Sequence, residues 1–108
     1  MSSNLTPFTQ GVIKAIEAIP KGFVASYGFI AMLAGNSHSG RIVGYLTHSL
    51  RLNLPYHRVV FKDGSICPGS QFGHPDIQRE MLLSEGVVFL PNGRVNMSKS
   101  AWDGKSYF

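Results

Sequence analysis

The segment Pro-Tyr-His-Arg-Val at residues 55–59 places a phenol, an imidazole and a guanidinium side by side, and it holds the first candidates for chemistry. Tyr56 is a weak candidate nucleophile, because a phenol has an ordinary pKa of about 10 and its phenolate is hard. The thiol of Cys67 is intrinsically better suited, but it lies eleven positions after Tyr56 and has no adjacent histidine to serve as its base. We therefore expect Cys67 to be a small loop thiol and His57 to have nothing suitable to activate.

Positive charge is concentrated in the middle of a chain whose net charge is +4. Between residues 18 and 62 there is no carboxylate, and three of the four histidines lie in this stretch. A stretch with one sign of charge favours a polyanionic partner, because phosphates that are neutralised release their counterions. A chance fluctuation in a mildly basic protein would give the same pattern, so charge alone leaves both interpretations open. The basic residues of the stretch are Lys21, Arg41, Arg51, Arg58 and Lys62.

Three helices are predicted in the first half of the chain. The first begins after Thr6, a hydroxyl N-cap followed by proline, and carries an apolar stripe through residues 8–19. The second spans about residues 27–34 with Ser26 as its cap, and the third spans about residues 39–50. Because a glycine-containing turn separates the last two, they predict a helix-turn-helix over about residues 26–50. The residues expected to face inward in the third helix are Ile42, Val43, Leu46 and Leu50.

The third predicted helix opens with the small residues Ser39 and Gly40, and Gly44 follows farther along. Between them stands one long cation, Arg41. Small residues on a helix face permit the close approach of another surface. That surface is either DNA or a neighbouring helix, and the sequence leaves these alternatives open.

The second half of the chain mixes strand and helix signals. Residues 58–61 form a run in which Arg58 is followed by β-branched and aromatic residues, and this run predicts a strand that an Asp-Gly pair at residues 63–64 ends in a tight turn. Pro75 opens a further helix that ends at Gly86. Residues 87–95 predict a small hairpin or an extended arm, and the aromatic tail beyond them either packs on the body or stays loose. The core candidates of the helix are Ile77, Met81 and Leu82.

The composition indicates one folded domain rather than a disordered tail, since 44% of the 108 residues are hydrophobic and 15% are charged. We expect a mainly α domain over residues 1–108 with a small β-hairpin and a C-terminal arm at about residues 90–108. The single cysteine excludes an internal disulfide. The chain begins without a basic stretch followed by an apolar run, and no run has the length of a membrane span. We therefore expect a soluble, cytoplasmic monomer without a signal peptide.

The motif at residues 55–59 resembles the active-site signature Pro-Cys-His-Arg-Val of the O6-alkylguanine-DNA alkyltransferases, with Tyr56 in the position of the reactive cysteine. Other segments resemble family motifs in the same order along the chain. The resemblance covers about residues 6–88, which correspond to the C-terminal domain of those enzymes, and it implies a winged-helix-like helix-turn-helix DNA-binding domain. The further matching segments are residues 19–22 and 26–28, residues 41–44 in the recognition helix, residues 62–64, and residues 82–86 with the glutamate of the catalytic relay.

One branch of that family, the alkyltransferase-like proteins, replaces the cysteine, usually with tryptophan. Its members bind O6-alkylguanine in DNA without removing the alkyl group and are linked to nucleotide excision repair. Tyr56 keeps the aromatic character of the position. The resemblance therefore implies a non-enzymatic sensor of O6-alkylguanine in double-stranded DNA, which works with nucleotide excision repair proteins and needs no cofactor and no metal.

The resemblance also implies roles for single residues. Tyr56 would stack with or flank a base flipped into a lesion pocket, and Arg41 would occupy the space that the base leaves. Tyr27 would contact the phosphate of the target nucleotide. His57 and Glu85 would persist as a hydrogen-bonded pair beneath the pocket. The remaining implied residues are Asn53 as the hinge and Ser39, Gly40 and Gly44 as the surface for the minor groove.

Plainer alternatives stand beside these roles. Tyr56 would otherwise be an aromatic without a ligand, Arg41 a solvated helix residue, and Tyr27 a core aromatic at the start of a helix. For Arg58 we expect a structural ion pair rather than a DNA contact. The chain also departs from the family in a shorter segment between Arg41 and the motif, and in a poorly matching loop at residues 67–73.

Two other functions remain open at the level of sequence. The first is an active alkyltransferase or another enzyme that uses Cys67. The second is a transcriptional regulator whose helix-turn-helix recognises a particular operator. A regulator of that kind would need several polar residues on its recognition helix to read base edges in the major groove, and this chain offers few.

Overall fold

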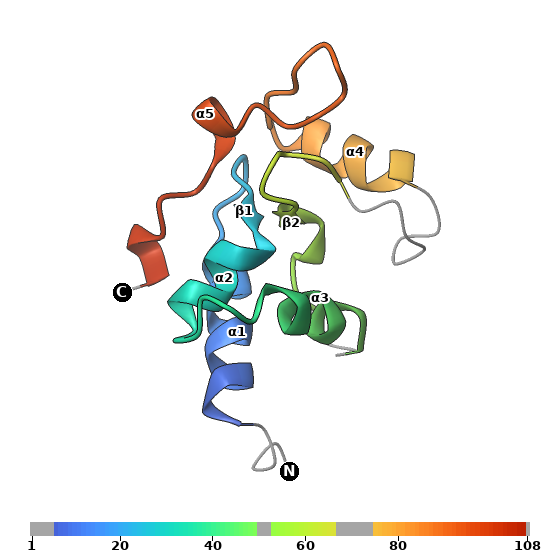
Figure 1. Ribbon diagram of the computed structural model, residues 1–108. Coiled ribbons are helices and arrows are strands. Elements are labelled where there is room, and N and C mark those ends of the chain that lie inside the picture. Colours follow the sequence, from blue (N-terminus) through green and yellow to red (C-terminus); the bar gives the residue numbers. More distant parts are fainter. Residues whose placement is uncertain (1–5, 50–52, 67–74, 108) are drawn as a thin grey trace.

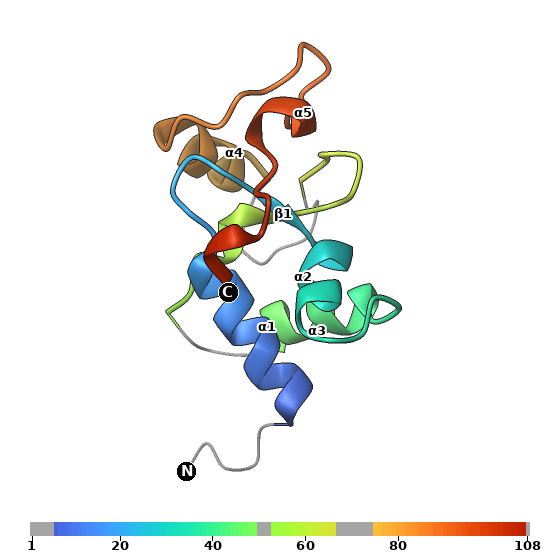
Figure 2. The same cartoon turned by 90° about the vertical axis from the view of Figure 1, so that its left-hand side faces the viewer.

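The computed structural model describes residues 6–49, 53–66 and 75–107 (Figure 1). Helices α1, α2 and α3 lie at one end of the molecule and α4 and α5 at the other, with two short strands between the groups (Figures 1 and 2). The mainly helical architecture with a small sheet confirms the predicted fold class. Within the described ranges, no helix is long and apolar enough to cross a membrane.

Helix α1 (Pro7–Ala18) begins where the sequence predicts. The Thr6 hydroxyl accepts a hydrogen bond from the Thr9 amide at 3.1 Å, and proline occupies the first helical turn, where its missing N–H is not needed. The helix then buries one apolar stripe in the main core. The fully buried residues of this stripe are Val12, Ala15 and Ile16.

Helices α2 (Tyr27–Leu33) and α3 (Gly40–Ser49) form the predicted helix-turn-helix. Ser26 caps α2, because its Oγ accepts a hydrogen bond from the amide three residues later at 3.1 Å. Gly35 turns the chain between the helices with a φ of +107°, which favours glycine. The predicted last residue of the third helix, Leu50, lies outside the described residues.

The apolar residues of α3 do not all face inward. Val43 is fully buried and Leu46 is half-buried, as predicted, whereas 51% of Ile42 is exposed. The inward stripe continues from Val43 to Thr47, one turn later, and the Thr47 hydroxyl is satisfied by donating to the Gly44 carbonyl at 2.8 Å. Ile42 falls outside this stripe, so its prediction as a core residue is wrong.

Strands β1 (Ala25–Ser26) and β2 (Val59–Val60) form a two-stranded sheet. The strands run parallel, with Ala25 opposite Val59. A 3-10 helix, η2 (Tyr56–Arg58), leads directly into β2. The sheet therefore fixes the motif at residues 55–59 against the start of the helix-turn-helix.

The β structure differs in one respect from the predicted hairpin. In residues 87–95 the ladder is reduced to an antiparallel bridge between Phe89 and Val95. After the turn at Gly64, the chain pairs back on Phe61 through one hydrogen bond, from the Phe61 amide to the Ser65 carbonyl at 3.0 Å. The Gly64 carbonyl accepts a further hydrogen bond from the Val95 amide at 2.9 Å, which joins this turn to the later segment.

Helix α4 (Pro75–Ser84) is present as predicted, but its inward face is not the expected one. Leu82 is fully buried, whereas 45% of Ile77 and 37% of Met81 are exposed, so those two are not core residues. The inward stripe instead runs through Leu82 and Gln78, which is only 1% exposed and lies one turn earlier. A glutamine can occupy this place because its amide hydrogen-bonds to backbone carbonyls of the neighbouring segment.

The C-terminal segment packs on the body. After α5 (Met97–Ser100), the Trp102 amide donates to the Val24 carbonyl, and the Val24 amide donates to the Ser100 carbonyl, each at 2.8 Å. The Trp102 side chain is buried in the main core, and its ring is nearly perpendicular to that of Phe29 at a centroid distance of 6.0 Å. The segment is therefore part of the fold and not a loose arm.

A final 3-10 helix, η3 (Lys105–Tyr107), closes this segment onto α1. The Trp102 indole donates to the Ser106 hydroxyl at 3.0 Å, and that hydroxyl donates to the Ala18 carbonyl at 3.0 Å. These two hydrogen bonds satisfy the polar edge of the indole and join the end of the chain to the end of α1. Phe108, also predicted as part of the aromatic tail, lies outside the described residues.

We expect Trp102→Ala to lower the free energy of unfolding by about 3–5 kcal/mol, since it empties a large site in the main core. Urea denaturation would measure this change. Leu90→Ala is the matched control, because Leu90 is 39% exposed and its loss should change stability by less than about 0.5 kcal/mol. Equal unfolding midpoints for the two variants would show that the tail does not contribute to the core.

Candidate nucleic-acid interface

The first turns of α2 and α3 meet almost without side chains between them. A Cβ added to Gly40 would lie 3.5 Å from the Gly28 Cα, which is ordinary contact. Farther along α3, among the described residues a Cβ on Gly44 would meet only the Tyr27 ring, at 3.9 Å, and a Cβ on Gly28 would meet nothing within 4 Å. Of these three glycines, packing inside the protein therefore explains at most the one at position 40. Gly28 and Gly44 present open backbone to the outside.

The long cation of the recognition helix is available to a partner. Arg41 is exposed in the first turn of α3, and neither a hydrogen bond nor an ion pair joins it to another described residue. Gly40 and Gly44 on either side of it are half-buried, whereas Ser39 is buried with 9% exposure. Among the small residues predicted to face DNA, Gly40 and Gly44 thus reach the surface, and Ser39 is mainly part of the interior.

Tyr27 occupies the junction between the two helices and the strand that follows the motif. It is half-buried, and its ring packs against Phe61 with centroids 5.3 Å apart and planes tilted by 56°. Its ring is also the nearest group to Gly44. Tyr27 therefore combines a supporting contact to the protein with partial exposure beside α3.

Tyr56 stands at the start of η2 and is half-buried at the margin of the main core. Its amide donates to the Leu54 carbonyl at 2.8 Å and so closes a tight backbone turn. Asn53, the predicted hinge residue, is exposed just before this turn. Cys67 and the loop at residues 67–73 lie outside the described residues.

Arg58 is an ion-pair residue, as predicted. Its Nε and Nη2 donate to the two carboxylate oxygens of Glu85 at 2.9 and 2.8 Å, a forked arrangement, and its Nη1 donates to the Ile19 carbonyl at 2.9 Å. The Arg58 side chain is 16% exposed and that of Glu85 is 12% exposed. The pair thus joins η2, the segment after α4 and the end of α1 in a nearly buried position.

His57 and Glu85 form the predicted hydrogen-bonded pair, with Nε2 and Oε2 2.9 Å apart. The hydrogen bonds from Arg58 lower the pKa of Glu85 from 4.5 to about 2, against the opposing effect of burial and with a smaller contribution from His57. Glu85 is therefore ionised at neutral pH and accepts, so His57 donates from Nε2. Nε2 is thereby engaged with Glu85.

Gln78 belongs to the motif's support, and sequence reasoning missed it. Its Nε2 donates to the carbonyls of His57 at 2.9 Å and Val59 at 3.3 Å, while its Oε1 is buried with no partner among the described residues. A buried acceptor without a partner is unfavourable, so the two donated bonds must offset that cost. A polar residue one turn before buried Leu82 was the available signal, but hydrophobic periodicity assigns such a residue to the surface.

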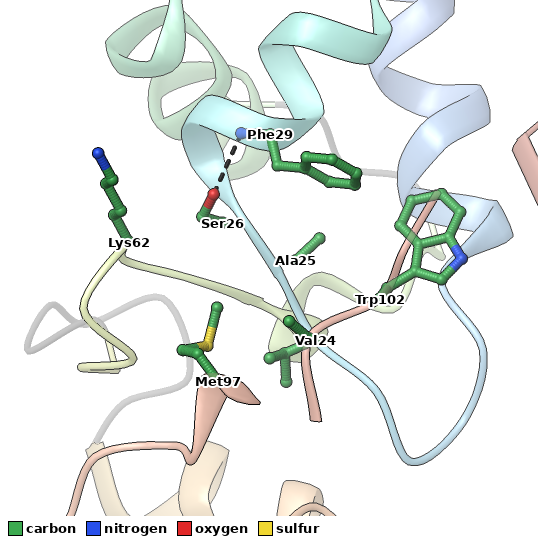
Figure 3. A pocket seen from close by; sticks show the side chains of 8 residues that line it. Val24, Ala25, Ser26, Phe29, Lys62, Met97 and Trp102 are labelled. Atoms are coloured by element: carbon green, nitrogen blue, oxygen red, sulfur yellow. Dashed lines mark hydrogen bonds between the residues drawn. The ribbon is translucent and has the colours of Figure 1, made fainter. Parts of the chain in front are cut away.

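Two further features bear on ligands. A mainly apolar hollow of about 280 Å³ lies between β1, the start of α2 and the C-terminal segment, with Lys62 at its rim (Figure 3). The sequence did not predict this hollow, because neither the charge nor the spacing of the motif at residues 55–59 indicates it. Within the described ranges, no cluster of three or more His, Cys, Asp or Glu side chains could hold a metal ion. The residues lining the hollow are Val24, Ala25, Ser26, Phe29, Lys62, Met97, Ala101 and Trp102.

We expect Glu85→Gln to lower the free energy of unfolding by about 3 kcal/mol at pH 7, since it leaves Arg58 nearly buried without its counter-charge. Because folding lowers the pKa of Glu85 from 4.5 to about 2, the ionised group stabilises the fold above pH 4.5, and this stabilisation is lost as the pH falls toward 2. The difference between the two proteins should therefore shrink over that range. Urea denaturation at a series of pH values measures it.

Glu80→Gln is the control for this experiment, because Glu80 is an exposed carboxylate in α4, the helix that ends just before Glu85. Its stability should follow the wild-type curve at every pH. A Glu85→Gln curve that runs parallel to the wild type down to pH 2 would contradict the stabilising role of the ion pair.

Comparison with known proteins agrees with this geometry. Residues 7–87 match the family model of the 6-O-methylguanine DNA methyltransferase, DNA binding domain. The DNA base-flipping protein of Escherichia coli (strain K12) is 37% identical over 100 residues, which cover 89% of this chain and 74% of that protein. The constitutive methylated-DNA–protein-cysteine methyltransferase of Bacillus subtilis (strain 168) is 37% identical over 68 residues, 61% of this chain and 41% of the enzyme.

Among solved structures, S. pombe Atl1 in complex with damaged DNA containing O6-carboxymethylguanine superposes with a TM-score of 0.77 at 28% sequence identity. The match covers 93% of this chain and 98% of that one. The chain belongs to the family of the 6-O-methylguanine DNA methyltransferase DNA-binding domain.

Proposed function

We propose that this protein is a non-enzymatic sensor of alkylated DNA, which binds O6-alkylguanine in a duplex from the minor groove and flips the base into a pocket. The observation that carries the proposal is Tyr56, an aromatic residue at the nucleophile position of the motif at residues 55–59. We further propose that the bound lesion is flagged for nucleotide excision repair. Two comparisons support the proposal. The E. coli relative is named a DNA base-flipping protein, and Atl1 is seen in complex with damaged DNA.

The chemistry of the motif argues against alkyl transfer. A phenol with an ordinary pKa of about 10 is almost wholly protonated at neutral pH, and its oxygen is a poorer acceptor of an alkyl carbon than a thiolate. His57 donates its Nε2 hydrogen to Glu85, which leaves Nδ1 able to act as a base, but Tyr56 offers that base no thiol to activate. The triad of Arg58, His57 and Glu85 therefore has a structural use that persists without catalysis.

The same residues suit base flipping. Extruding a base costs a few kcal/mol, and less where alkylation has already weakened its pairing. Stacking on an aromatic ring such as that of Tyr56 returns about 1–3 kcal/mol. Arg41 is free to enter the duplex and meet the orphaned cytosine, and Tyr27 stands where it can contact a backbone phosphate. Asn53, exposed before η2, is the hinge in this proposal.

A titration at one stated salt concentration tests the proposal, with duplexes that carry guanine, O6-methylguanine or a bulkier O6-adduct at the same position. We expect both lesion duplexes to bind more tightly than guanine in every flanking sequence. Arg41→Ala should weaken lesion binding by about 2 kcal/mol, or thirtyfold, because the vacated space is left unfilled. Fluorescence anisotropy would measure each dissociation constant.

Arg94→Ala is the matched control, since it removes the same charge from an exposed site in the loop between α4 and α5 and should change binding little. Label moving from an O6-methyl group to the protein would show an active transferase and overturn the sensor. Dependence on one operator sequence, with no preference for the lesion, would indicate a transcriptional regulator instead.

Gly44→Ala separates packing from DNA contact. Among the described residues, the added methyl meets only the Tyr27 ring at 3.9 Å, and alanine favours helix over glycine by about 0.8–1.0 kcal/mol, so we expect an equal or higher melting temperature. DNA affinity should nevertheless fall about tenfold or more, because the methyl group occupies space between α3 and the groove. Thermal unfolding and anisotropy measure the two effects. Unchanged affinity would exclude Gly44 from the interface.

A further inference from the structure

The outer face of α3 carries large apolar side chains as well as small residues. Tyr45 is 69% exposed and Ile42 is 51% exposed. Tyr45 lies one helical turn after Arg41 on the same face, and Ile42 lies beside them. The opposite face holds Val43 and Thr47 in the interior. Ile42 and Tyr45 together are named the α3 apolar pair.

Nothing within the described protein explains the exposure of this pair. Neither residue belongs to or packs against the two hydrophobic cores, and the Tyr45 phenol has no hydrogen bond to a described residue. Leaving one apolar side chain in water is common, but two on one face of a short helix suggest an external partner. Polar residues would serve solubility better at these positions.

The surroundings of the pair favour DNA over a protein partner. The exposed cation Arg41 stands in the same face, and the sequence has no carboxylate from residue 18 to residue 62 to repel a phosphate backbone. The open backbone at Gly44 allows a second surface to approach α3 closely. A flat protein surface would not need this combination of positive charge and missing side chains.

We propose that the α3 apolar pair acts as a wedge in the minor groove, where Ile42 and Tyr45 press on the sugars and base edges beside Arg41. The inference rests on the proposed function and adds specific contacts to it. Proteins that bind the minor groove often insert apolar side chains that partly unstack a base step and bend the duplex. A wedge next to Arg41 would weaken stacking at the target nucleotide and so ease its extrusion.

The wedge has a signature that distinguishes it from a phosphate contact. Each phosphate that a protein cation neutralises releases counterions, and this release sets the slope of log Kd against log salt concentration. Ile42 and the Tyr45 ring carry no charge. Their removal should therefore weaken binding while leaving the salt slope unchanged.

The test compares Ile42→Ala, Tyr45→Ala and Tyr45→Phe in anisotropy titrations on an O6-methylguanine duplex and on its guanine counterpart at several salt concentrations. We expect each alanine variant to lose about tenfold or more in affinity on the lesion duplex, with the wild-type slope. Tyr45→Phe should bind like the wild type, since it keeps the ring. End-to-end energy transfer on the same duplex should show less bending with the alanine variants.

Leu90→Ala is the matched control, because Leu90 is an exposed apolar residue in the loop between α4 and α5, at the other end of the molecule from α3 (Figure 1). It should bind like the wild type. Melting curves of all variants exclude unfolding as the cause of a loss, and exposed sites should leave them unchanged.

Alanine variants that bind both duplexes like the wild type would overturn the wedge. A loss in Tyr45→Phe equal to that in Tyr45→Ala would replace the wedge at Tyr45 with a hydrogen bond from its phenol. If the wedge fails while Arg41→Ala still weakens lesion binding, the proposed function stands. If the wild type itself does not prefer the lesion duplex, the proposed function fails. If the alanine variants then also bind the guanine duplex as tightly as the wild type does, the wedge fails as well.

Discussion

The ion pair of Arg58 and Glu85 holds together segments that are far apart in the sequence, and the candidate site depends on it. Arg58 belongs to η2, Glu85 follows α4, and the remaining arm of the guanidinium binds the Ile19 carbonyl after α1. Breaking such a nearly buried pair costs about 3–5 kcal/mol, a large share of the stability of a small domain. Because η2 begins at Tyr56, the same interaction sets where that aromatic side chain stands relative to the helix-turn-helix.

Around this pair, several contacts hold the motif at residues 55–59 in place, whereas the outer face of α3 is exposed. Gln78 holds the carbonyls of the motif from one side, and β1 pairs with β2 from the other. The proposed base-flipping site would need such preorganisation, since a pocket displaced by a fraction of an ångström would return less of the extrusion cost. The outer face of α3, in contrast, makes few contacts with the body. Its residues, Arg41 above all, are free to meet a partner.

How much the sequence could predict depended on whether the determining contact was local. The caps at Thr6 and Ser26 act within one turn, so the helix starts were predictable. Gln78 was not, because the carbonyls it binds come from a segment about twenty positions earlier. Ile42 was misplaced for a related reason: periodicity finds apolar residues, but it cannot tell whether the surface that meets them belongs to the same chain. The motif at residues 55–59 identified the site, while its supports were set by tertiary contacts.

The survival of His57 and Glu85 beside Tyr56 follows from these contacts. In an alkyltransferase the two residues would activate a thiol, and with Tyr56 in that position they have no thiol to act on. Yet Glu85 also binds Arg58, so its loss would leave a guanidinium nearly buried without a counter-charge. Selection for stability alone would therefore keep Glu85, the hydrogen-bond partner of His57, whether or not the protein transfers alkyl groups. For this reason the pair of His57 and Glu85 is weak evidence that the protein is an enzyme. The tyrosine at position 56 is stronger evidence, and it argues against alkyl transfer.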